Sequence, residues 1–134
     1  MSFLNKLQPI GLLALRVALG VIFVYHGYPK LMGDTQRTAQ FFASIGLAPF
    51  LVAVVGIVEL FGGVLLLLGL FTRVAAALLA GTMAVAIWKV HLGKGILAVS
   101  EYEFAMALGG AALALATTGA GKASLDYAIF RQKA

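Results

Sequence analysis

Four apolar blocks dominate this sequence and restrict what it can fold into. Crossing the hydrocarbon core of a bilayer takes about 20 helical residues, and each block approaches or reaches that length. The blocks cover residues 9–28, 49–70, 74–90 and 103–118. Of the 134 residues, 62% are hydrophobic and only 11% are charged, so too few polar side chains remain to cover a water-soluble surface. We therefore expect one all-α membrane domain, residues 1–134, built as a four-helix transmembrane bundle.

The composition also excludes several classes of function. The chain has no cysteine, so it forms no disulfide, thiolate zinc site or iron–sulfur cluster of its own. We expect no metal ion, and a redox role needs a bound cofactor or the thiols of a partner. The net charge of +5 comes from span ends and tails, which favours the lipid bilayer over nucleic acid as the partner. The N-terminal segment lacks the pattern of a removable signal peptide, so we expect it to remain.

The link between the first two blocks predicts a short helix lying on the membrane surface. In DTQRTAQFFASIGLAP, Asp34 or Thr35 can cap the start of this helix and Gly46 can end it. The apolar residues at helical spacing between them are Phe41, Phe42 and Ile45. At the end of the first span, Pro29 predicts a stop or a kink at Tyr28.

The distribution of basic residues predicts the orientation. Four spans place both termini and the turn before the third span on one side of the membrane. That side carries Lys6, Arg73, Lys122, Arg131 and Lys133. The opposite side carries Lys30, Arg37, Lys89 and Lys94, and we expect its lysines at the span ends to reach lipid phosphates. Because basic residues concentrate on the cytoplasmic side, we expect cytoplasmic termini.

Two charged residues lie well inside the predicted spans. An unpaired charge at the centre of a bilayer costs about 3 kcal/mol or more, so Arg16 and Glu59 need partners. With 3.6 residues per helical turn, Arg16 shares one face with His26 and Lys30, and that face should point into the bundle. An antiparallel second span places Glu59 at a depth between Arg16 and His26. We expect an Arg16–Glu59 ion pair, which is either part of a functional site or a structural pair that fixes helix register.

Two histidines lie near the outer ends of their spans. His26 either faces the headgroups or gives a proton or hydrogen bond to a ligand. His91 ends the third span on the same side, so a haem or metal held by both histidines is a further alternative. Glu103 is either a favourable charge at a helix N-terminus or another polar contact. The candidate ligand-binding residues are Arg16, His26, Glu59, His91 and Glu103.

A pocket between the first and second spans follows from this arrangement. We expect it to open toward the outer leaflet, with His26 above the charged pair and apolar walls that include Phe23 and Leu60. Mostly apolar walls suit an amphipathic ring better than a free ion.

The sequence resembles the DoxX family of small four-span bacterial membrane proteins. The resemblance rests on RVALGVIFVYHGYPKL, GLAP, ELFGGVLLLLGLFTR, YEFAMALGGAALAL and SLD, which cover nearly the whole chain in order. Matching positions are Arg16, Gly20, His26, Gly27, Lys30, Glu59, Gly62, Gly63, Gly69, Arg73, His91, Glu103 and Asp126. The resemblance implies a multi-pass protein of the bacterial inner membrane. Some relatives are membrane subunits of a thiosulfate:quinone oxidoreductase, and others associate with oxidative-stress or electron-transfer complexes.

Three hypotheses of function follow. In the first, the chain is a subunit of a quinone-coupled redox complex and holds a quinone near His26, with Arg16 and Glu59 tuning the histidine's charge. In the second, it is a non-enzymatic module that assembles or stabilises a partner complex. In the third, it is a small proton-linked transporter, which would need a homo-oligomer because four short spans make a small path. Whether the chain catalyses a reaction alone stays open, as does the identity of its protein partners.

Overall fold

The computed structural model describes residues 2–33, 35–44, 46–91 and 99–130, and every regular element within these ranges is helical. The helices are α1 (Ser2–Lys6), α2 (Gln8–Met32), α3 (Thr35–Ser44), α4 (Leu51–Leu68), α5 (Thr72–Ala86), the π-helical turn η1 (Ile87–His91), α6 (Val99–Thr118) and α7 (Leu125–Phe130). Several residues discussed above lie outside the described ranges: Asp34, Ile45, Lys94, Arg131 and Lys133.

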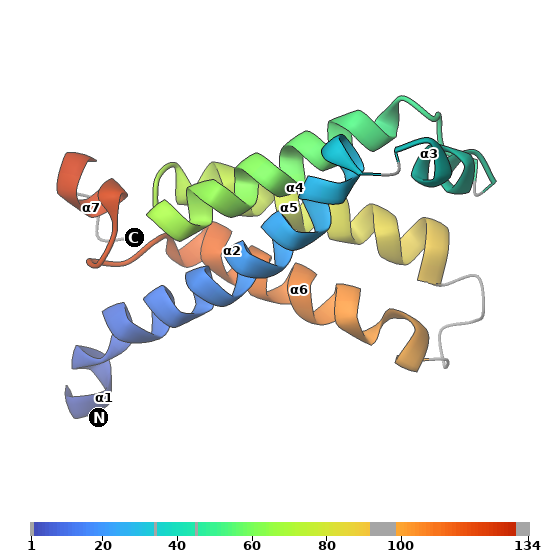
Figure 1. Ribbon diagram of the computed structural model, residues 1–134. Helices are drawn as coiled ribbons and strands as arrows, with labels where there is room; N and C mark the ends of the chain where they lie inside the picture. Colours follow the sequence, from blue (N-terminus) through green and yellow to red (C-terminus); the bar gives the residue numbers. More distant parts are fainter. Residues whose placement is uncertain (1, 34, 45, 92–98, 131–134) are drawn as a thin grey trace.

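Four long helices form the bundle, as the four apolar blocks predict (Figure 1). In the described part of the chain, three helical segments are long and apolar enough to cross a membrane: Gln8–Met32, Leu51–Leu68 and Thr72–Lys89. The described apolar segment of α6, Glu103–Thr118, is shorter. The all-α membrane bundle is therefore confirmed.

Pro29 does not end the first span, so the stop at Tyr28, one of the two predicted alternatives, is wrong. Helix α2 continues to Met32, with Pro29 inside it, and the backbone N–H of Gly33 donates to the carbonyl of Pro29 at 2.8 Å. A proline removes only one helical N–H, and spanning helices tolerate that loss. The last turn also packs on α4, where a Cβ atom at Gly56 would lie 3.0 Å from the side chains of Lys30 and Leu31.

Glycines let α2 and α4 approach each other closely. A Cβ atom at Gly27 would clash with the backbone of Leu60, and one at Gly63 would lie 2.9 Å from the carbonyl oxygen of Gly20. Small residues at such positions allow two helix backbones to pack in van der Waals contact. Helices α5 and α6 form a second closely packed pair, and the core between the pairs includes the fully buried Leu66, Leu79 and Leu115.

Helix α3 is the expected short helix between the first two spans. Its end at Gly46 is confirmed: Gly46 has a φ of +85°, its N–H donates to Ala43 O, and the N–H of Leu47 donates to Phe42 O. These two bonds are the Schellman arrangement, which favours glycine at the left-handed position. Figure 1 shows α3 at one end of the bundle, crosswise to the long helices, with α1 and α7 at the other end.

Candidate functional site

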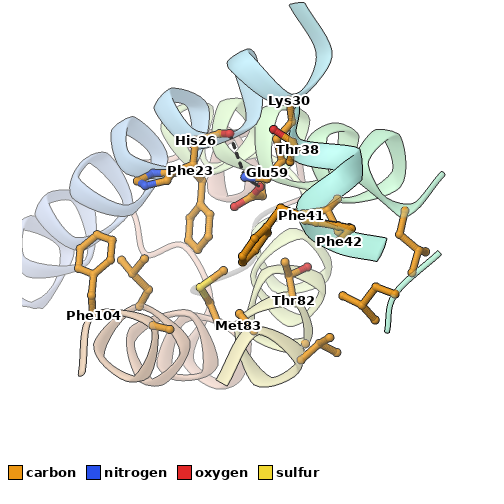
Figure 2. A pocket seen from close by; sticks show the side chains of 18 residues that line it. Phe23, His26, Lys30, Thr38, Phe41, Phe42, Glu59, Thr82, Met83 and Phe104 are labelled. Atoms are coloured by element: carbon orange, nitrogen blue, oxygen red, sulfur yellow. Dashed lines mark hydrogen bonds and ion pairs between the residues drawn. The ribbon is translucent and has the colours of Figure 1, made fainter. Parts of the chain in front are cut away.

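A cavity of about 880 Å³ lies between the long helices and is lined by residues of α2, α3, α4, α5 and α6 (Figure 2). Its walls are mainly apolar and include Phe23, Phe41, Phe42, Met83, Phe104 and Leu108. The polar side chains on its walls are His26, Lys30, Thr38, Glu59 and Thr82. The expected pocket between the first two spans is thus wider than predicted, because α3, α5 and α6 also contribute walls.

Glu59 is buried on the cavity wall and pairs with Lys30. Its side chain is 4% exposed, and its Oε1 atom lies 2.7 Å from the Nζ atom of Lys30. The same Nζ atom donates a hydrogen bond to the carbonyl oxygen of His26 at 3.1 Å. Lys30 therefore turns back along α2 toward a buried carboxylate, and the expectation that it reaches lipid phosphates is wrong.

The predicted Arg16–Glu59 ion pair is also wrong. The backbone of Glu59 and Leu60 packs against Gly27, which is eleven positions after Arg16 in α2. At a rise of 1.5 Å per residue, eleven positions separate the two levels by about 16 Å along the helix, beyond the reach of an arginine side chain. The prediction placed Glu59 too close to Arg16 because sequence spacing does not determine the register between two helices.

Arg16 instead joins three distant parts of the chain. The residue is 1% exposed, its Nη1 atom donates to Leu66 O at 3.2 Å, and its Nη2 atom donates to Ala123 O. Leu66 lies in the last turn of α4, where the negative end of the helix dipole favours a cation. Arg16 does not line the cavity and holds the end of α4 and the segment before α7 together.

Asp126 completes this cluster and was not among the candidate residues. The carboxylate is 3% exposed and accepts hydrogen bonds from the backbone N–H of Phe71 at 2.7 Å and of Thr72 at 2.9 Å. It also lies close enough to Arg16 to interact electrostatically. One sequence signal could have identified it: helix α5 starts without a capping side chain of its own, so its first N–H groups need an acceptor from elsewhere.

His26 lies on the cavity wall near the exposed ring of Phe104, at 6.0 Å between ring centroids. Its Nδ1 atom lies 2.8 Å from Ile22 O. Because a carbonyl oxygen only accepts hydrogen bonds, Nδ1 carries the proton, and in the neutral ring Nε2 is a free acceptor. His26 on the cavity wall therefore retains acceptor capacity at Nε2.

Of the remaining candidates, the structure describes the side chain of Glu103 and not that of His91. Glu103 is exposed at the start of α6, next to Phe104, and does not line the cavity. His91 ends η1, and its side chain lies outside the described part of the structure. Leu60 does not line the cavity either. Among the residues that the structure describes, no group of three His, Cys, Asp or Glu side chains is arranged to hold a metal ion.

Fold and site together define a helical membrane protein with a mainly apolar, partly polar cavity that is partly open. The family model of DoxX matches residues 11–92. The chain is 40% identical over 130 residues to the "Putative oxidoreductase CatD" of Bacillus subtilis, an alignment that covers 97% of this chain and 95% of the relative. It is 35% identical over 130 residues to the inner membrane protein YphA of Escherichia coli, over 89% and 90% of the two chains. The chain belongs to the DoxX family. No solved structure matches it.

Proposed function

We propose that this protein is a membrane subunit of a quinone-coupled redox system and that it binds a quinone-type ring in the cavity. The observation that carries the proposal is the cavity itself. Its volume of about 880 Å³ falls in the range of small-molecule sites, and such sites combine apolar walls with a few placed polar groups. A quinone has the same combination, with a flat apolar ring and polar oxygens on its edge.

The aromatic and sulfur-containing side chains support an aromatic ligand. Phe23 and Phe42 are buried on the cavity wall, and Met83 lies on the opposite side, on α5 (Figure 2). Aromatic rings pack well against one another in offset or edge-to-face arrangements, and thioether sulfur makes favourable contacts with ring edges. His26 provides a polar contact next to these surfaces, and in its protonated form it would donate to a ring oxygen.

The names of the relatives agree with a redox role only in a general way. One is named "Putative oxidoreductase CatD", and another is named only as an inner membrane protein. The proposal therefore assigns binding of the ring to this chain and electron transfer to a partner protein of the complex. Cytoplasmic termini and location in the bacterial inner membrane are part of the same proposal.

Binding of duroquinone to the detergent-purified protein tests the proposal. Duroquinone should raise the unfolding temperature of the wild-type protein in a concentration-dependent manner. His26→Ala should weaken this shift and leave the unfolding temperature without ligand nearly unchanged, because the side chain is exposed. Tyr28→Ala is the matched control, since Tyr28 is also an exposed ring on α2 but does not line the cavity.

If duroquinone and its reduced form both fail to shift the wild-type protein, the redox proposal is wrong and the assembly module takes its place. One observation favours that second function. Arg16 contacts only parts of the chain that fix the helix ends, and this is what a polar residue does in a purely structural module. Co-purification of a protein partner without any bound ring would then be the expected result.

A further inference from the structure

We infer that the cavity selects the reduced, hydroxyl-bearing form of its ligand, a quinol rather than a quinone. The inference rests on the proposed function and names the ligand class more narrowly. It follows from the hydrogen-bonding capacity that four polar side chains of the cavity, His26, Lys30, Glu59 and Thr82, retain once their protein partners are counted.

Two of these side chains have already used their only hydrogen-bond donor. The Nδ1–H group of His26 is bonded to Ile22 O, so the neutral ring offers Nε2 as an acceptor. The hydroxyl of Thr82 donates to Leu78 O at 3.0 Å, so its oxygen retains only acceptor capacity. Both side chains line the cavity.

Glu59 adds a third acceptor, and Lys30 leaves one donor. The carboxylate of Glu59 contacts Lys30 through Oε1, and among the described residues this atom accepts no other hydrogen bond. An ionised carboxylate has acceptor capacity on both oxygens and no donor. The ammonium of Lys30 has three N–H groups, of which one faces Glu59 and one is bonded to His26 O, so one remains.

Thr38 aside, the polar side chains of the cavity therefore present three acceptors, on α2, α4 and α5, and one remaining donor, on Lys30. Figure 2 shows His26 and Glu59 on the side formed by α2 and α4, with Thr82 across the cavity on α5. A 1,4-quinol carries two O–H donors on opposite edges of its ring and can satisfy acceptors on both sides. A quinone carries only carbonyl acceptors, which cannot pair with these three acceptors and would leave the buried carboxylate of Glu59 without a donor from the ligand.

Three compounds with the same tetramethylated ring separate these cases: durohydroquinone, duroquinone and the dimethyl ether of durohydroquinone. Their apparent Kd values are measured by thermal-shift titration of the purified protein under anaerobic conditions, which keep the quinol reduced. Durohydroquinone should bind about tenfold tighter than the other two, because only it has hydroxyl donors. The ether controls for ring shape and apolar contact.

Two variants test which side chains set the preference. Thr82→Val keeps the side-chain shape and removes an acceptor, so it should lower the preference for the quinol about threefold. Glu59→Gln introduces donors at the cavity wall and should shift binding toward duroquinone. Thr117→Val is the matched control, since Thr117 also donates to the carbonyl four residues before it, on α6, and does not line the cavity. It should leave the preference unchanged.

The possible outcomes distinguish the preference for the quinol from binding of the ring itself. The inference is supported if the wild-type protein binds the quinol more tightly than the quinone, and if this preference is smaller in Thr82→Val and unchanged in Thr117→Val. Equal binding of durohydroquinone and duroquinone overturns the inference and leaves the proposed function standing. Absence of binding by all three compounds overturns both.

Discussion

At the scale of single residues, five ionisable side chains form two separate groups. Arg16 and Asp126 hold helix ends together, whereas Lys30, Glu59 and His26 lie at the cavity. A distance of about 16 Å along α2 separates the levels of Arg16 and Glu59. The first group serves the fold, and only the second is available to a ligand.

A double-mutant cycle distinguishes the observed ion pair from the one expected from sequence spacing. Glu59→Gln and Lys30→Met should each lower the free energy of unfolding by about 3 kcal/mol, since each leaves a charge unpaired in the bundle. The double variant should lose clearly less than the sum. Glu59→Gln combined with Arg16→Met should be additive within about 0.5 kcal/mol, because the two side chains do not meet. The free energy of unfolding of the detergent-purified protein is the quantity to measure. Strong coupling between Arg16 and Glu59 would contradict the structure.

Sequence patterns located the residues of the cavity better than their partners. Charge at membrane depth was sufficient to single out Glu59, and helical spacing placed His26 and Lys30 on an inward face. The partner of each charge depends on the register between helices, which glycine contacts such as Gly27 against Leu60 determine. Such contacts join residues that are far apart in the sequence, so local sequence patterns do not reveal them. For the same reason Thr82, on another helix, was not recognised.

At the scale of helices, glycines determine how closely the first pair packs. Gly56 and Gly63 are seven residues apart and so share one face of α4, and both contact α2. Gly62 instead faces Leu79 on α5, and Gly69 ends α4 with a φ of +68°. Gly69 is needed there for its left-handed backbone and because a Cβ atom would clash with Arg16.

Adding one methyl group at two positions of α2 tests this packing. Gly27→Ala should lower the free energy of unfolding by about 1–3 kcal/mol, because the methyl group would overlap the backbone of Leu60, which cannot move away as a side chain can. Gly11→Ala is the matched control, since nothing lies within 4 Å of its Cβ position. It should be neutral or stabilise the protein by up to about 1 kcal/mol through helix propensity. Equal effects of the two substitutions would show that α2 and α4 are not packed this closely.

The ends of helices were predictable where local backbone chemistry decides them. Gly46 ends α3 through a left-handed residue and two backbone hydrogen bonds, and both follow from the local sequence. The end of α2 was not predictable in this way. Pro29 disfavours continuation locally, but packing of the following turn against Gly56 extends the helix to Met32.

At the scale of the whole molecule, the cavity lies between two pairs of helices. Helix α2 packs mainly on α4, and α5 packs on α6, and the cavity occupies space between the two pairs. The amphipathic pattern of α3 predicted a surface helix, and the same apolar face supplies Phe41 and Phe42 to the cavity. Four apolar blocks were enough to predict a helical bundle. They did not predict this wider cavity, because its walls come from segments far apart in the chain.

The most direct test of the proposed function is the small-molecule content of the protein purified in mild detergent. Organic extracts of the wild-type protein and two glycine variants are compared by mass spectrometry. Gly81 lines the cavity, whereas Gly110 on α6 does not, and a Cβ atom at either position would meet nothing within 4 Å. The wild-type protein and Gly110→Leu should carry a quinone-type molecule, and Gly81→Leu, which fills part of the cavity, should not. A wild-type extract without such a molecule, or equal amounts in wild type and Gly81→Leu, would contradict binding in this cavity.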